Sequence, residues 1–209
     1  MNPREARGRS PDEARIFLVR HGRSEGNRGG ALLGRGDPPL TPAGEAEADA
    51  AAALLTRRIR PGVHLYTSPL IRARESARRI GARLGVPVRL APPLIELDMG
   101  RLEGARWADL PKERARWEAA PERYRFPDGE GLDDVARRTE AWFVEEIGTP
   151  QGDVILVAHL FVILALTARR LRLPLDEILR LYLAPGGVIE LHSGPKGDLL
   201  HGLYPGGLL

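Results

Sequence analysis

Two histidines, one of them beside an arginine, stand where buried strands are expected to end. Arg20 and His21 close the apolar run IFLV, and His159 closes the run VILVA. Carboxyl ends of parallel strands meet at one edge of a sheet, where ligands bind, so both histidines are expected at one site. Gly22 lets the backbone turn tightly after the first strand. Because an imidazole can act as a nucleophile or a general base, this pair favours a catalytic role.

Arg72 lies at the beginning of a helix that follows a third predicted strand. The segment TSPLIRARESARR places Ser68 at the helix N-cap and Pro69 at the first helical position. The helix dipole disfavours a cation in the first turn unless an anion lies nearby. Arg72 and the residues at the other two strand ends therefore form a cationic, hydrogen-bonding set that fits a dianionic phosphoryl group.

The sequence predicts no metal-binding site, no thiolate site and no P-loop nucleotide site. Glu96, Asp98 and Glu103 are close together in LIELDMGRLEG, but their spacing matches no calcium or zinc loop, although one of them could be a general acid. The chain has no cysteine and no G-x-x-x-x-G-K-[ST] loop, which excludes thiolate sites and disfavours P-loop hydrolysis. No functional role is predicted for the remaining histidines, His64, His192 and His201.

The elements that must position these residues alternate between strand and helix. This alternation predicts an α/β fold, a three-layer sandwich whose mostly parallel central sheet is flanked by helices. Strands are predicted at 15–21, 63–68, 86–90, 153–159 and 187–193, and helices at 41–60, 69–84, 132–147, 160–171 and 175–181.

Residues 15–209 are expected to form a single domain. Residues 1–14 mix charges without an apolar stretch and are interpreted as a disordered tail rather than a signal peptide. Residues 104–131 set aromatic side chains among Arg, Glu and Pro, which is typical of an insertion. We expect this insertion to form a lid over the C-terminal edge of the strands.

Composition excludes several classes of partner. The net charge is only +3 and no basic block stands out, so binding to nucleic acid is not expected. The longest apolar run, 154–168, is interrupted by His159 and is shorter than the roughly 20 residues that span a bilayer, so no membrane association is expected. Together with the absence of cysteine, this predicts a soluble, cytoplasmic protein.

Six ordered blocks, from about 16 to 166, resemble the histidine phosphatase superfamily, which includes the cofactor-dependent phosphoglycerate mutases. LVRHGRSEGN resembles its R-H-G-x-S/T-x-x-N signature, and VILVAHL resembles the block of its second histidine. The blocks between them are GRGDPPLTPAGEAEA, YTSPLIRARESA, LIELDMGRLEG and FPDGEGLDDVARR.

The resemblance implies a nucleophilic His21 that forms a phosphohistidine, with no metal and no cofactor. It implies that Glu96 donates a proton to the leaving oxygen and then activates water. The expected state of His21 is neutral, with the Nδ1 proton held by a backbone carbonyl and Nε2 directed at phosphorus. The residues implied to hold the phosphoryl oxygens are Arg20, Arg72 and His159, with a further hydrogen bond from Asn27. Further residues are expected to contact the phosphate or the rest of the substrate: Gly22, Leu33, Gly34, Leu160 and Phe161.

Three positions depart from the family pattern. Leu160 stands where the family usually has glycine after the second histidine, Leu33 stands beside Gly34 where a polar residue is common, and Gly131 replaces a serine. In one interpretation, Leu33, Leu160 and Phe161 form an apolar wall that favours hydrophobic or bulky leaving groups. In the other, Leu160 weakens phosphate binding and the chain is a low-activity or non-catalytic regulatory relative.

A phosphatase is favoured over a phosphoglycerate mutase, because the residues after Glu96 lack the mutase R-H-Y-G-x-L-x-G-x-N-K run, although Arg101 and Arg106 could imitate it. The expected partner is a small-molecule phosphate ester, whose identity depends on the lid. The C-terminal stretch GLYPGGLL carries apolar residues that could dock on a second copy or fray, so a homodimer is a further expectation.

Overall fold

The computed structural model describes residues 14–195 and 197–206, with the backbone alone at 27–29. The tail predicted at 1–14 lies outside this range except for Ala14. That residue is the first of strand β1 (Ala14–Arg20) and is buried, so its assignment to the tail was wrong.

A six-stranded mixed sheet forms the centre of the molecule, in the order β3-β2-β4-β1-β5-β6. The pairs β3–β2, β2–β4 and β4–β1 are parallel, and β1–β5 and β5–β6 are antiparallel. The last strand was not predicted, although it contains the beginning of the C-terminal apolar stretch. The strands after β1 are β2 (His64–Thr67), β3 (Val88–Leu90), β4 (Val154–Ala158), β5 (Val188–Gly194) and β6 (Gly197–Tyr204).

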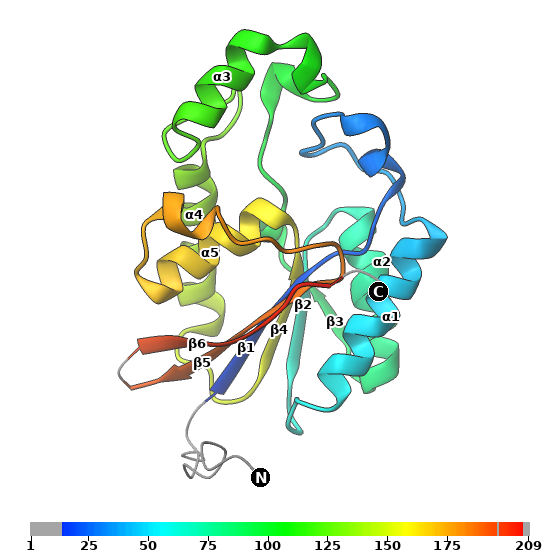
Figure 1. Cartoon of the computed structure of the whole chain (residues 1–209). Helices are drawn as coiled ribbons and strands as arrows, with labels where there is room; N and C mark the ends of the chain where they lie inside the picture. Colours follow the sequence, from blue (N-terminus) through cyan, green and yellow to red (C-terminus); the bar gives the residue numbers. More distant parts are fainter. Residues whose placement is uncertain (1–13, 196, 207–209) are drawn as a thin grey trace, which may run out of the picture.

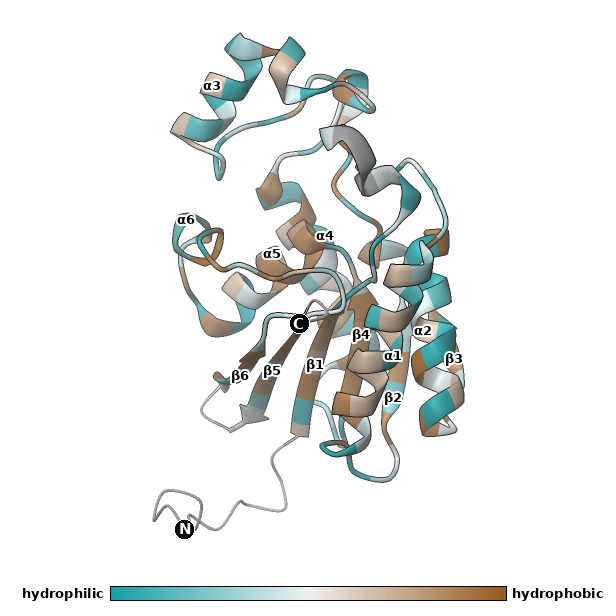
Figure 2. Ribbon diagram, turned by 45° about the vertical axis from the view of Figure 1, so that its right-hand side comes forward, coloured by the Kyte–Doolittle hydropathy of each residue, from teal (hydrophilic) through white to brown (hydrophobic). Residues whose placement is uncertain are grey.

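Helices cover both faces of the sheet, as the predicted three-layer fold requires (Figure 1). Strand side chains alternate between two cores: Phe17 and Val19 pack toward α1 and α2, whereas Ile16 and Leu18 pack toward α4 and α5. The apolar residues of the sheet lie between these layers in Figure 2. The helices are α1 (Pro42–Thr56), α2 (Ile71–Leu84), α3 (Pro111–Ala119), α4 (Leu132–Trp142), α5 (Leu160–Leu171) and α6 (Leu175–Ile178). None of the described helices is both long and apolar enough to cross a membrane.

The insertion at 104–131 lies at the end of the molecule toward which β1 runs, as expected of a lid (Figure 1). It contains α3, which was not predicted. Trp107, Trp117, Tyr124 and Phe126 pack against one another with ring centroids 5.0–6.4 Å apart. The ring centroid of Trp117 also lies 5.6 Å from that of Phe161 in α5, so aromatic packing holds the insertion against the rest of the domain.

A buried ion pair joins the amino ends of β1 and β4. The Asp153 carboxylate accepts hydrogen bonds from Arg15 Nε at 3.1 Å and Nη2 at 2.6 Å, and from the Arg60 amide at 2.8 Å. Arg15 is 6% exposed and Asp153 is 1% exposed, so each charge depends on the other. The pair lies just before the first register partners, Ile16 and Val154.

Candidate active site

His21 and His159 lie side by side because they follow neighbouring parallel strands. Arg20, the last residue of β1, pairs with Ala158, the last residue of β4. The His21 amide continues this ladder by donating to the Ala158 carbonyl at 3.0 Å. The imidazole centroids are 5.0 Å apart, in an edge-to-face arrangement. The sheet therefore brings both predicted histidines to one place.

The neighbours of His21 determine which of its ring nitrogens carries the proton. Its Nδ1 lies 2.6 Å from the Gly22 carbonyl, and its Nε2 lies 3.2 Å from Nε of Arg72. A carbonyl only accepts and a guanidinium only donates, so Nδ1 carries the proton and Nε2 presents its lone pair. Burial, and then the Arg72 charge, hold the pKa of His21 well below its ordinary value. The ring is neutral, as the sequence analysis expected.

The close approach of α1 to the segment after β1 requires a glycine at position 22. A Cβ added to Gly22 would lie 2.0 Å from the Gly44 carbonyl oxygen, closer than any real contact. The Gly22 amide donates to Ser76 Oγ at 3.1 Å, which ties this segment to α2. The close approach of α1 thus explains this glycine, rather than the predicted tight backbone turn, because the φ of Gly22 lies outside the left-handed region.

Arg72 lies in the first turn of α2 and is 1% exposed. Its Nη1 donates to the Gly36 carbonyl at 2.6 Å and its Nη2 to the Gly34 carbonyl at 2.8 Å. Burial lowers the pKa of Arg72, an effect that the Glu96 charge opposes. A guanidinium with both terminal nitrogens held this way keeps Nε directed at His21.

The predicted N-cap of this helix was wrong. The helix begins at Ile71 with Leu70 at the N-cap, whose own side chain makes no capping hydrogen bond, and the Ile71 amide donates to Asp37 Oδ1 at 2.6 Å. Ser68 Oγ instead accepts a bond from the Leu70 amide at 3.3 Å and lies 2.7 Å from Nε2 of His159. The serine therefore orients the second histidine, a role that requires β2 and β4 to be neighbours and that the linear sequence did not reveal.

Glu103 holds the loop that positions Arg72, and the sequence analysis gave it no such role. Its carboxylate accepts bonds from the Gly34, Arg35 and Gly36 amides at 3.0–3.2 Å. Arg72 binds carbonyls of this loop while Glu103 binds its amides, so the loop is fixed from two sides. Both polar backbone atoms of Gly34 are used in this way, and its predicted contact with substrate stays a prediction.

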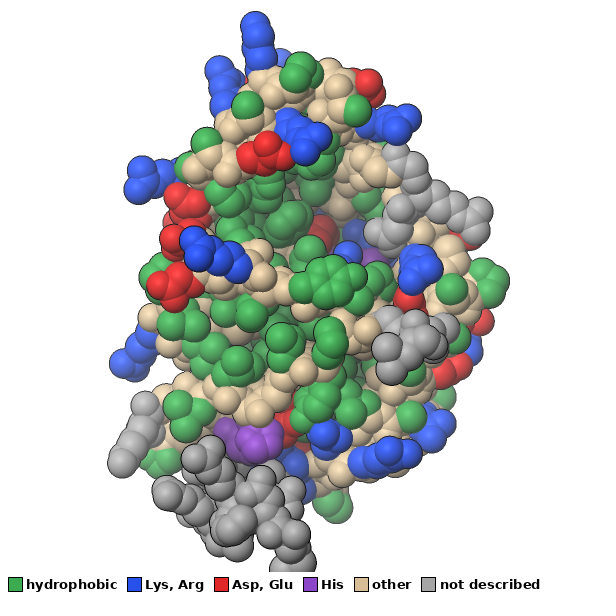
Figure 3. Space-filling model, viewed as in Figure 1, with side chains coloured by type: hydrophobic (Ala, Val, Ile, Leu, Met, Phe, Trp, Pro, Cys, Tyr) green, Lys and Arg blue, Asp and Glu red, His purple; other side chains and the backbone are tan. Residues whose placement is uncertain are grey.

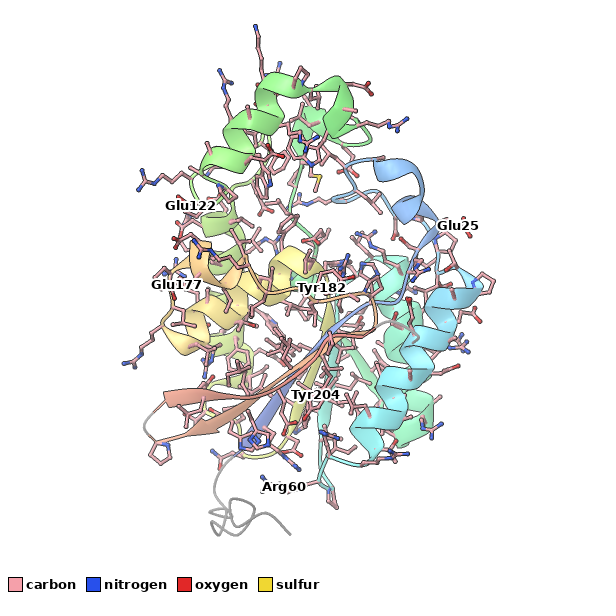
Figure 4. The ribbon with its side chains drawn as sticks, viewed as in Figure 1. Glu25, Arg60, Glu122, Glu177, Tyr182 and Tyr204 are labelled. Atoms are coloured by element: carbon pink, nitrogen blue, oxygen red, sulfur yellow. The ribbon has the colours of Figure 1, made fainter. Side chains whose placement is uncertain are left out.

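Two polar atoms of the site have no hydrogen-bond partner among the described residues. Nε of Arg20 and Nδ1 of His159 are both buried and unpartnered. Arg20 Nη1 donates to the Leu183 carbonyl at 2.6 Å, next in sequence to the exposed Tyr182, which Figure 4 labels. Burial is the main cause that lowers the pKa of Arg20 and the pKa of His159. Arg20 Nε is a donor, and His159 Nδ1 is a donor when the Ser68 hydroxyl donates to Nε2. Unpartnered buried polar atoms are costly, and a phosphoryl oxygen would accept hydrogen bonds from both nitrogens in that tautomer.

Glu96 completes the group. It is 5% exposed, and Oε1 accepts a bond from the Leu97 amide at 2.8 Å. Burial raises the pKa of Glu96, and the nearby charges of Arg72 and Arg20 oppose that rise. Arg138 holds the backbone here by donating to the Glu96 carbonyl at 3.2 Å. A carboxyl with a raised pKa next to arginines has the environment of a general acid.

The other predicted site residues lie in different places. Leu33 has its methyl groups against Gly26 and Gly36, and Leu160 packs with Ile178 of α6 and Leu164. Phe161 contacts Trp117 of the insertion. Phe161 of the predicted apolar wall thus meets the insertion, and Leu160 packs against the core cluster that includes Tyr124 and Phe126. The side chain of Asn27 lies outside the described residues.

Figure 3 shows histidine, basic and acidic side chains at a hollow in the upper part of the molecule, beside a broad area of hydrophobic side chains. The site offers cationic and neutral nitrogen groups together with the buried carboxyl of Glu96. This set suits a phosphoryl anion rather than a divalent cation.

Known proteins resemble the chain over nearly its whole length. The profile of the Histidine phosphatase superfamily (branch 1) matches residues 16–204. An Enterobacter sp. (strain 638) protein named Probable phosphoglycerate mutase GpmB is 34% identical over 89% of this chain and 94% of its own. The mycobacterial glucosyl-3-phosphoglycerate phosphatase, solved with VO3, is 31% identical, with a TM-score of 0.79 over 93% of this chain and all of its own. The alpha-ribazole phosphatase from Shigella flexneri is 25% identical, with a TM-score of 0.79 over 91% and 96%.

The fold, the paired histidines and these similarities agree. The chain is an enzyme of the histidine phosphatase superfamily, as the resemblance of its motifs indicated.

Proposed function

We propose that this enzyme is a phosphomonoesterase of the histidine acid phosphatase type that works through a phosphohistidine. One observation carries the proposal. The Nδ1 proton of His21 is held by Gly22 while its Nε2 faces Arg72, in a pocket where Arg20 Nε and His159 Nδ1 have no partner in the described part of the chain. A tetrahedral anion that displaced the Arg72 Nε contact would meet the Nε2 lone pair of His21 and several hydrogen-bond donors together.

The first step transfers the phosphoryl group to the enzyme. The Nε2 lone pair of His21 attacks phosphorus, the bond from phosphorus to the ester oxygen breaks, and Glu96 gives its proton to that oxygen. Arg20, Arg72 and His159 stabilise the charge on the three remaining oxygens, which is the main demand of this reaction. The lone pair comes from an imidazole that burial already keeps neutral.

The second step returns the enzyme to its starting state. Glu96, now a carboxylate, takes a proton from water as the water oxygen attacks phosphorus. The bond from phosphorus to Nε2 breaks, which releases inorganic phosphate and restores the lone pair of His21. All groups in this proposal belong to the chain, and its carboxyl alternates between acid and base.

Hydrolysis is preferred to mutase chemistry on a sequence difference. A mutase must hold a phosphorylated acid until the group returns, and the basic run that serves this purpose is absent after Glu96. The named relatives include both mutases and phosphatases, so the assay must distinguish them.

The substrate proposed is a small phosphate ester with an apolar or bulky leaving group. The support comes from the contact between Phe161 and Trp117, which extends an aromatic cluster beside the site, and from Tyr182, which is 75% exposed near Arg20. Aromatic surfaces favour apolar groups. The cytoplasmic location and the homodimer stay predictions.

Hydrolysis of p-nitrophenyl phosphate tests the proposal. We expect turnover that resists a chelator and is abolished by His21→Ala, while His64→Ala, at an exposed histidine, leaves it unchanged. Trapping of acid-labile phosphate on the wild-type protein would identify the intermediate. Conversion of 3- to 2-phosphoglycerate, stimulated by 2,3-bisphosphoglycerate, would instead establish a mutase. Failure of the folded protein to release phosphate from a broad panel of esters would favour the non-catalytic relative.

A further inference from the structure

Three potential metal ligands meet on the β5–β6 hairpin. Glu190 and His192 are two residues apart on β5, so their side chains lie on the same face of the sheet. His201 belongs to β6. His192 pairs with Arg15 at the amino end of β1, whereas His21 follows its carboxyl end. The group therefore lies at the opposite end of the strand from the candidate active site.

A β-bulge brings His201 into this group. Glu190 pairs with Gly202 and Leu191 pairs with Leu200, so His201 is an extra residue between two register partners. Bulges change the direction of a side chain relative to a regular strand. Here the rings of His201 and His192 stack, with centroids 3.9 Å apart and planes 13° from parallel.

One pair of the ligand atoms already has the separation that a small cation needs. Oε1 of Glu190 lies 3.0 Å from Nε2 of His192, and the ligand atoms of all three residues lie within 4.8 Å of one another. Two ligands each about 2.1 Å from a zinc ion, at angles of about 90–110°, are roughly 3.0–3.4 Å apart. The first pair already meets this distance, and exposed His201 needs only a small movement.

The carboxylate is oriented by its other oxygen. Glu190 is 2% exposed, and its Oε2 accepts a hydrogen bond from the Tyr204 hydroxyl at 3.1 Å and lies 3.4 Å from Nε of Arg58. Carboxylates that bind metals are held in this way by neighbours that do not touch the ion. Arg58, which follows α1, and Tyr204 of β6 thus hold Oε2 and direct Oε1 at the histidines.

We propose that Glu190, His192 and His201 bind a divalent transition metal ion of the zinc class. Two imidazoles and one carboxylate suit zinc better than magnesium or calcium, which prefer oxygen ligands. A cavity of about 440 Å³ borders both histidines and gives the ion access and room for a water ligand. Bound there, the ion links β6, an edge strand, to β5.

Titration with zinc chloride, followed by calorimetry, tests the site. The protein is tag-free, because an affinity tag of histidines would bind the ion, and is stripped with chelator beforehand. We expect one zinc ion per chain at this site and a higher melting temperature with zinc than without. His192→Ala and His201→Ala are each expected to weaken binding by more than about tenfold.

Two controls separate this site from other histidines. His64→Ala, at an exposed position on β2, and His21→Ala, in the candidate active site, are expected to keep the zinc affinity of the wild-type protein. His201 is exposed, so His201→Ala folds even if a change at buried Glu190 does not. Wild-type affinity in His201→Ala, or loss of the zinc equivalent in His21→Ala, would overturn the proposal.

Discussion

At the scale of single residues, the site sets the protonation states of His21 and Glu96 in different ways. Burial and the Arg72 charge keep His21 neutral, so its Nε2 carries a lone pair, which accepts the hydrogen bond from Arg72 Nε in this structure. Glu96 is kept protonated to higher pH than an ordinary carboxyl, because burial penalises its charged form. The same surroundings therefore prepare one group to attack and the other to donate.

Glu96→Gln tests this division. An amide cannot protonate the leaving oxygen, so hydrolysis of alkyl phosphates is expected to slow by about 10²–10⁴-fold in kcat/KM. An activated aryl ester such as p-nitrophenyl phosphate needs little protonation and is expected to slow much less. Steady-state kinetics on both substrates give the ratio. Equal losses would show that Glu96 is not the general acid.

Leu160 is expected to contribute to stability more than to specificity, because its side chain packs with α6. We expect Leu160→Gly to lower the free energy of unfolding by about 1–3 kcal/mol and to change p-nitrophenyl phosphate turnover less than about twofold. Urea unfolding and kinetics measure these two effects. A large gain on small phosphates would instead support the restrictive apolar wall.

At the scale of elements, the site depends on a loop rather than on strands alone. The histidines are placed by β1 and β4, but the guanidinium of Arg72 is aligned by carbonyls at 34 and 36. That loop is in turn held by Glu103. Glu103 thus acts on the site through the loop and is a positioning residue.

Glu103→Gln is expected to lower kcat/KM by about 10- to 100-fold, since a misplaced guanidinium stabilises the phosphoryl oxygens poorly. An amide offers one acceptor oxygen to the three backbone donors and adds a donor of its own. Inhibition by inorganic phosphate is expected to weaken in parallel. Glu118→Gln, at an exposed partner of Arg114 on α3, provides the matched control. Wild-type kinetics in a folded Glu103→Gln protein would exclude the positioning role.

The sequence allowed prediction of the elements that are apolar throughout or carry strong signals. The strands ending at His21 and His159 read as buried, and the helix at 160–171 was placed at its observed bounds. Strand β6 was missed because its residues are mostly exposed and alternate irregularly around a bulge. The contacts of Ser68 and Glu103 could not be predicted, because each joins segments that only the tertiary fold brings together.

At the scale of the whole molecule, burying two neutral imidazoles makes stability depend on pH. The folded-state pKa values of His21 and His159 lie well below the ordinary 6.5, with burial as the main cause. Below pH 6.5 the unfolded chain gains protons that the folded chain does not bind. The free energy of unfolding that depends on these two histidines is therefore at its full value above that pH. It decreases as the pH falls, by up to about 1.4 kcal/mol per pH unit for each histidine.

His21→Asn combined with His159→Gln is expected to reduce this loss. Unfolding by urea at about pH 7.5 and about pH 5.5 gives the difference in free energy for each protein. The double variant should lose less stability between the two conditions than the wild-type protein, and His64→Gln should behave as wild type. An identical decrease in all three proteins would mean that the buried imidazoles do not cause the acid sensitivity.

The ion pair of Arg15 and Asp153 affects the histidines at the opposite ends of β1 and β4. Strands β1 and β4 can slide past each other only in steps of two residues if their faces are to stay matched, and each step shifts one strand by about 6.6 Å. Such a shift would carry His21 out of reach of His159. By favouring one register at the amino ends of β1 and β4, the ion pair fixes the distance between the two imidazoles at the carboxyl ends of these strands, although it contacts neither imidazole.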